Sequence, residues 1–139
     1  MAAKDKIHDA VVEALEKDNW FTKSPLYIAV PGSGVEIDLA AEKMILAERD
    51  KERIAVEIKT FGIDSIMQAF SNALGKYRIY LRALSKSSTH KDRKLFIATS
   101  MQGYYRLMDI EFIRETILEE NIALIVVDVS KKIIKEWIE

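Results

Sequence analysis

Residues 53–61 read Arg53-Ile54-Ala55-Val56-Glu57-Ile58-Lys59-Thr60-Phe61, an apolar run interrupted by a carboxylate and an ammonium group two positions apart. Side chains two positions apart on a strand point to the same face, so Glu57 and Lys59 should project together. A second carboxylate, Asp38, lies upstream in the apolar setting of residues 35–39. An Asp beside a Glu-x-Lys strand is a set of groups suited to holding a divalent cation against a phosphodiester.

Composition sets broad bounds on the protein. The chain has 139 residues, so we expect one domain, 1–139. Its net charge of −1 does not by itself indicate a polyanionic partner. The absence of cysteine excludes disulfides, zinc–thiolate sites and a cysteine nucleophile. His8 and His90 are too far apart in sequence to suggest a spaced metal pair. No run approaches the roughly 20 apolar residues of a membrane span and the N-terminus resembles no signal peptide, so we expect a cytoplasmic protein with no membrane contact.

Hydrophobic spacing predicts the secondary structure. Helices are expected at 4–17, 65–85 and 109–120, and strands at 26–30, 53–61, 95–99 and 123–127. Residues 35–39 and 44–48 should be extended, whereas 132–139 could form a strand or a helical turn. The runs at 95–99 and 123–127 do not alternate, which indicates burial on both faces.

This order, αβββαβαβ, predicts an α/β fold. A right-handed crossover through the long helix should bring strand 95–99 parallel to a strand of a preceding three-stranded meander. We therefore expect a mixed central sheet flanked by helices.

The position of Asp38 is the weak point of the predicted site. A turn at 50–52 would place Lys43 to Ile45 opposite Glu57 to Lys59, with Asp38 several residues beyond. A bend or bulge among residues 39–43 could bring Asp38 back. Glu36 and Glu42 share strand parity with Asp38, so either could supply the acid instead.

The acidic motif and its order resemble the PD-(D/E)XK nuclease superfamily, and several segments resemble the XisH family more closely. XisH proteins are the cyanobacterial fdxN-element excision controlling factors. The similarity covers nearly the whole chain, and the segments that carry it are Pro25-Leu26-Tyr27-Ile28, Ile37-Asp38-Leu39-Ala40-Ala41-Glu42-Lys43, Ile54-Ala55-Val56-Glu57-Ile58-Lys59-Thr60-Phe61 and Ala73-Leu74-Gly75-Lys76-Tyr77.

This resemblance implies a restriction-endonuclease-like fold and a DNA-directed role. The family controls excision of a DNA element by a separate site-specific recombinase, and a small companion protein, XisI, is associated with it. By the superfamily pattern, Asp38, Glu57 and the carbonyl of Ile58 would bind Mg²⁺ or Mn²⁺, and Lys59 would orient or deprotonate the attacking water. Gln68 would reach the site from the start of the long helix, although with Ser65 it also fits a capping box.

Two functional hypotheses remain open. The first is a metal-dependent DNA endonuclease, with Lys76, Arg78 and Arg82 contacting the phosphate backbone. The second is a non-catalytic accessory factor that binds DNA or a partner protein, with a homodimer also open. The structural alternatives are a surface ion pair between Glu57 and Lys59, and a solvated basic helix face. Four tyrosines could stack on bases: Tyr77, Tyr80, Tyr104 and Tyr105. Tyr77 also fits the apolar stripe of its helix.

Overall fold

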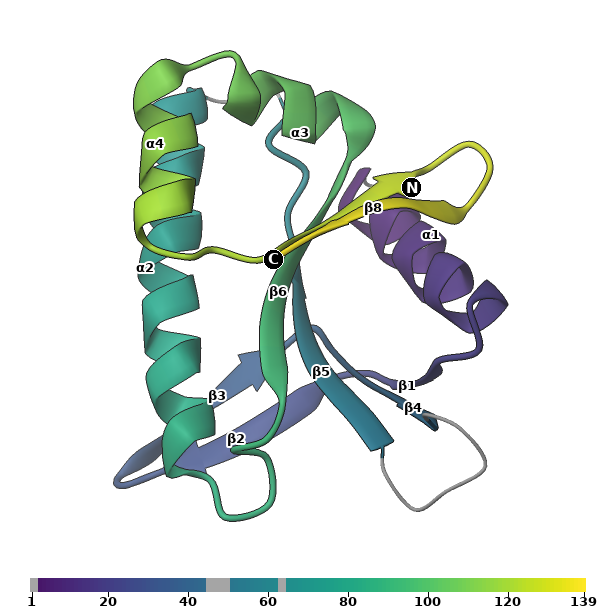
Figure 1. Cartoon of the computed structure of the whole chain (residues 1–139). Coiled ribbons are helices and arrows are strands. Elements are labelled where there is room, and N and C mark those ends of the chain that lie inside the picture. The colour runs from purple at the N-terminus through teal and green to yellow at the C-terminus, as the bar shows by residue number, and fades with distance from the viewer. Residues whose placement is uncertain (1–2, 45–50, 63–64) are drawn as a thin grey trace.

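The protein is described by a computed structural model in which residues 3–44, 51–62 and 65–139 are placed. A six-stranded mixed sheet in the order β1-β4-β5-β6-β7-β8 forms the centre, with helices on both faces (Figure 1). This confirms the predicted fold class. The elements are α1 (Ala3–Lys17), β1 (Phe21–Lys23), β2 (Leu26–Val30), β3 (Ser33–Ile37), β4 (Leu39–Met44), β5 (Lys51–Ile58), α2 (Ile66–Lys86), β6 (Lys94–Ser100), α3 (Met101–Met108), α4 (Glu111–Glu119), β7 (Leu124–Asp128) and β8 (Ile133–Ile138).

The parallel strands β5, β6 and β7 form the middle of the sheet. The long helix α2 connects β5 to β6, as predicted for a crossover between parallel strands. All five residues from Leu95 to Thr99 are buried, as are Leu124 to Val127, which confirms that both runs are covered on both faces. Among the described helices, none combines the length and apolar character required to span a bilayer.

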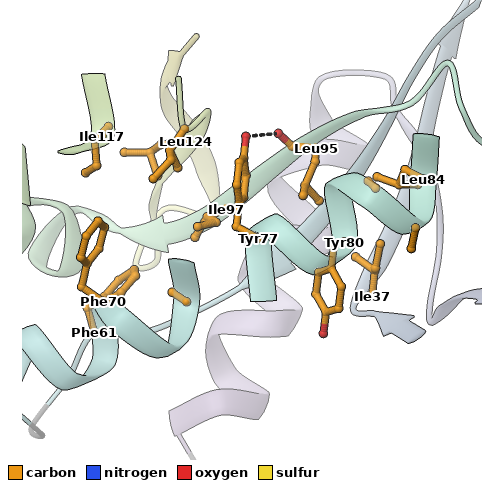
Figure 2. Packing of buried hydrophobic residues seen from close by; sticks show 14 of the residues in the cluster. Ile37, Phe61, Phe70, Tyr77, Tyr80, Leu84, Leu95, Ile97, Ile117 and Leu124 are labelled. Atoms are coloured by element: carbon orange, nitrogen blue, oxygen red, sulfur yellow. Dashed lines mark hydrogen bonds between the residues drawn. The ribbon is translucent and has the colours of Figure 1, made fainter. Parts of the chain in front are cut away.

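The core lies in two layers, one on each face of this sheet. Helix α1 packs Val11 and Leu15 against Ile54, Val56 and Phe96 on one face. Helices α2 and α4 cover the opposite face, where Phe70, Tyr77 and Ile117 meet residues such as Ile97 and Leu124 (Figure 2). Alternate residues of β5 therefore serve different layers, which leaves Glu57 on the α2 side.

Several predicted elements need correction. The predicted three-stranded meander is wrong. β2 and β3 form a separate two-stranded sheet, whereas β4 and β5 belong to the central sheet. The sequence analysis also missed β1, which has three residues and is too short for a periodic signal. It missed α3 as well, an eight-residue helix that begins directly after β6 with Ser100 as its cap. The tail is a strand, β8, paired with β7.

The register between β4 and β5 corrects the predicted position of Asp38. Lys51 and Glu52 belong to β5, so the predicted turn at 50–52 is wrong; residues 45–48 lie outside the described part of the chain. Met44 pairs with Lys51 and Leu39 pairs with Val56. Asp38, directly before β4, therefore lies beside Glu57 without any bulge among residues 39–43.

A buried arginine binds the middle of the β4–β5 pair. The guanidinium of Arg93, whose side chain is 5% exposed, donates to the carbonyl oxygens of Ala41 on β4 (3.3 Å) and Ile54 on β5 (3.1 Å). It also donates to Glu42 Oε1 (3.4 Å) and to His90 Nδ1 (3.0 Å). A buried guanidinium needs such acceptors, and their positions bind both strands to one side chain.

The hydroxyl of Tyr77 joins α2 to two parts of the sheet. It donates to the carbonyl oxygen of Leu95 on β6 (3.2 Å; Figure 2) and accepts from the N–H of Ala123 before β7 (3.1 Å). The ring is 5% exposed, so Tyr77 is a core residue and is not available for base stacking. Tyr80 is similarly buried, which corrects the same expectation for it.

Replacing Tyr77 with Phe should destabilise the fold by about 1–3 kcal/mol, because the substitution leaves the buried N–H of Ala123 without its acceptor. Urea denaturation of the variant and wild type measures this difference. Tyr105→Phe is the matched control, since Tyr105 is 63% exposed. Equal losses in the two variants would contradict a structural role for the Tyr77 hydroxyl.

Candidate functional site

The central feature of the site is a pair of neighbouring carboxylates, each of which accepts a hydrogen bond from a backbone N–H of the other strand's end. The N–H of Asp38 donates to Glu57 Oε1 (3.3 Å), and the N–H of Ile58 donates to Asp38 Oδ2 (2.8 Å). Asp38 and Glu57 come from neighbouring strands and lie at the end of β5 where the parallel ladder stops. These hydrogen bonds orient both carboxylates at the same point of the sheet.

Glu57 is a weaker acid than an ordinary glutamate, because its pKa is raised. Burial raises its pKa to about 7, and the nearby negative charge of Asp38 acts in the same direction. The ammonium group of Lys76 and the Asp38 N–H lower the pKa and offset part of this effect. A carboxylate with a pKa raised by burial and by a second acid is characteristic of functional sites, because structural sites rarely keep such pairs together.

A pocket of about 410 Å³ opens beside these acids, between the end of β5 and the middle of α2. Its polar lining consists of Glu57, Lys59, Thr60, Asn72 and Lys76. Tyr77, Ala73 and Ile97 form apolar walls. The pocket therefore combines an acidic end with two lysines and further hydrogen-bonding groups.

The structure brings together part of the predicted site. Glu57, Ile58 and Lys59 line this pocket, and Asp38 is hydrogen-bonded to two of them. Gln68 is exposed and does not line the pocket; its N–H donates to Ser65 Oγ (3.4 Å), which is half of the predicted capping box.

The two alternative acids lie elsewhere. Glu36 is exposed on β3, in the hairpin with β2. Glu42 lies opposite Arg53 near the other end of β4. Burial disfavours its charge, but Lys51, Arg53 and Arg93 hold its pKa below the ordinary value. Its carboxylate is therefore engaged in an ion-pair network away from Asp38.

The predicted DNA-contacting residues separate into different environments. Lys76 lies at the pocket, with its Nζ 3.7 Å from Glu57 Oε2. Arg78 forms an ion pair with Glu120, and Arg82 is exposed further along α2. The basic stretch is thus only partly a solvated face, because one of its lysines belongs to the site.

Sequence reasoning missed Thr60 and Asn72, and it gave Tyr80 a different role, stacking on bases. Thr60 and Asn72 line the pocket. Burial raises the pKa of Tyr80 to about 12, and Glu57, Asp38 and Glu36 contribute to this rise. The only available signal for Asn72 was its position four residues before Lys76, which puts both on one helix face.

The donor set fits a hard divalent cation. Asp38 and Glu57 supply carboxylate oxygens at one point, and their mutual repulsion would be relieved by a bound positive ion. Across residues 3–44, 51–62 and 65–139, no group of three or more His, Asp or Glu side chains converges to hold a metal. A cation here would rely on the two carboxylates, a backbone carbonyl and water, as Mg²⁺ often does.

Replacing Glu57 with Gln should change how the stability of the protein depends on pH. Because the pKa of Glu57 is raised in the folded protein, the wild type loses stability as the pH rises from about 4.5 to about 7. The variant lacks this loss and should be more stable than the wild type above pH 7, by about 1–3 kcal/mol, and similar to it at low pH. Urea denaturation across this pH range measures the difference. Glu36→Gln, which changes an exposed acid, should show the same pH dependence of stability as the wild type. A stability difference between Glu57→Gln and the wild type that does not change with pH would contradict the raised pKa.

Comparison with known proteins identifies the family. The model of the family described as "XisH protein" matches residues 1–135. A crystal structure of an XisH family protein from Nostoc punctiforme is 33% identical, with a TM-score of 0.83, covering 97% of this chain and 100% of that one. A crystal structure of an fdxN element excision controlling factor protein from Anabaena variabilis is 34% identical, with a TM-score of 0.84, covering 97% and 99%. None of the curated proteins matches this chain.

The match to the family model and the likeness to both solved structures extend over nearly the whole chain, including β4, β5 and α2, which carry the site. They agree with the resemblance expected from the sequence. The chain belongs to the XisH family.

Proposed function

We propose that this protein acts on DNA during excision of a DNA element, and that Asp38, Glu57 and Lys59 form a divalent-cation-dependent site for phosphodiester hydrolysis. The observation that carries the proposal is the pair of facing carboxylates next to a lysine-lined pocket. The solved relative from Anabaena variabilis is named as an excision controlling factor, which supports a role in DNA excision for this chain.

The chemistry follows from the groups present. Hydrolysis forms a bond from water oxygen to phosphorus and breaks the bond from phosphorus to a sugar oxygen. Asp38 and Glu57 would hold Mg²⁺ or Mn²⁺, with the carbonyl of Ile58 as a backbone ligand. The cation would stabilise negative charge on the phosphate. Lys59, on the pocket wall beside Glu57, would orient the attacking water and neutralise charge that develops on the phosphate oxygens.

A second function is favoured by a different observation. Glu57 already has a cationic neighbour in Lys76, and the described residues supply only two carboxylates at this point. This arrangement also suits a non-catalytic factor that binds DNA, or a companion protein of the XisI type, and so regulates a recombinase. Metal binding separates the two candidates, because only the first requires it.

Addition of Mn²⁺ should raise the melting temperature of the wild type by several degrees, since ligand at 100 times its Kd stabilises a protein by about 2.7 kcal/mol. Asp38→Asn and Glu57→Gln should each remove most of this shift, because each deletes one of the two carboxylates. Differential scanning fluorimetry at pH 8, with and without Mn²⁺, measures the effect.

Two further variants complete this test. Lys59→Met should keep the Mn²⁺ shift but abolish nicking of a plasmid, because Lys59 is assigned to the water and not to the metal. Glu36→Gln should keep both, since Glu36 is exposed on β3. Absence of a Mn²⁺ shift in the wild type would reject the hydrolytic function and favour the accessory one.

A further inference from the structure

The hydrolytic site leaves two features of the exposed surface of α2 unexplained. The first is the position of Lys76. Its Nζ lies 3.7 Å from Glu57 Oε2, yet its side chain is 57% exposed, whereas that of Glu57 is 14% exposed. The ammonium group is therefore at the rim of the pocket, loosely paired and close to solvent. A solvated ion pair of this length contributes little to stability, so stability alone gives no reason for it.

The second feature is Gly75, next to Lys76 in the middle of a 21-residue helix. Glycine at such a position weakens a helix relative to alanine. A Cβ added at Gly75 would meet no atom within 4 Å, so packing within the described chain does not require glycine there. Gly75 is exposed, directly before Lys76 in sequence and three residues after Asn72, so its backbone borders the helix face that carries those two side chains. A glycine allows another molecule to approach the backbone closely, because it has no side chain.

We propose that a DNA strand crosses α2 at Gly75, and that Lys76 exchanges its partner from Glu57 to a phosphate of that strand when the negative charge of Glu57 is neutralised. This inference rests on the proposed function and adds the residue that links the acidic pair to DNA binding. With Glu57 charged and without a cation, the pair retains Lys76. With a cation on the acids, Lys76 is released to the phosphate.

The pocket chemistry favours a phosphate as the new partner. Lys59, Lys76, Asn72 and Thr60 present hydrogen-bond donors around one opening, and among the described residues Glu57 is the only carboxylate that lines it. Once Glu57 is neutralised, the opening is cationic. Lysine contacts phosphate as a point charge and needs no fixed geometry, which suits a side chain that changes partners.

The first test uses DNA binding in metal-free buffer, with a fluorescein-labelled 20-nucleotide strand measured by anisotropy from about 50 to about 200 mM salt. Glu57→Gln mimics neutralisation, and we expect it to bind the strand several-fold more tightly than the wild type. Adding Lys76→Met should cancel this gain and reduce the slope of log K against log salt by about 0.7, the value for one lost phosphate contact on a single strand.

Lys86→Met is the matched control, because Lys86 is an exposed lysine on the same helix and does not line the pocket. In the Glu57→Gln background it should leave the gain in place. If Lys86→Met cancels the gain as fully as Lys76→Met, the effect is one of general charge and the proposal fails. It also fails if Glu57→Gln does not bind the strand.

Gly75→Ala tests the contact with the helix backbone. The added methyl group meets nothing within the described chain and improves helix propensity, so the urea midpoint should rise. The same variant should bind the labelled strand several-fold more weakly, because the methyl group intrudes where the strand passes. A more stable variant with unchanged DNA affinity would overturn the crossing at Gly75. None of these DNA measurements uses metal. The shift in melting temperature of the wild type with Mn²⁺ therefore tests the hydrolytic function separately.

Discussion

The antiparallel pairing of β4 with β5 determines where the acidic groups of this protein meet. Leu39 pairs with Val56, so Asp38 lies beside Glu57. The N–H of Asp38 donates to the Glu57 carboxylate, and the N–H of Ile58 donates to the Asp38 carboxylate. A shift of one residue would turn Glu57 away from the α2 face and into the layer beneath α1. The pocket, its lysines and the raised pKa of Glu57 all depend on this register.

Holding two carboxylates together is unfavourable, and the surrounding structure offsets part of the cost. The N–H groups of Asp38 and Ile58 stabilise the charged forms, and Lys76 supplies a nearby positive charge. The remaining repulsion appears as the raised pKa of Glu57. Proteins usually keep such local conflicts at functional positions, where a bound cation or substrate relieves them. This chain therefore carries two mutually repelling acids at the end of a strand that is otherwise largely buried.

Much of the fold could be predicted from the sequence because its central elements have strong patterns. The runs at 95–99 and 123–127 are continuously apolar, and the stripe along α2 recurs at helical spacing. The short elements β1 and α3 have too few residues for a periodic signal. The β4–β5 register could not be predicted, because the charged residues of 50–52 look like a turn although Lys51 and Glu52 continue a strand.

The same limits apply to the site. The Glu-x-Lys spacing and an upstream acid in an apolar run indicated Asp38, Glu57 and Lys59, because strand periodicity fixes which side chains share a face. The choice between Asp38 and Glu42 depended on the register. Glu42 is separated from the site by its ion pairs with Lys51, Arg53 and Arg93, which form only in the folded sheet. Lys76 could not be distinguished from other exposed lysines until α2 was placed against β5.

The buried guanidinium of Arg93 has a consequence for how this family can vary. It donates to one carbonyl on β4 and to one on β5, at the Ala41–Ile54 pair in the middle of the ladder. These hydrogen bonds support the register of β4 against β5 independently of the segment that connects the two strands. That connection is free to lengthen or shorten in evolution without moving one acid past the other. Relatives with different connections at this place are expected to retain the same acidic geometry, provided that they keep an arginine or an equivalent anchor in its place.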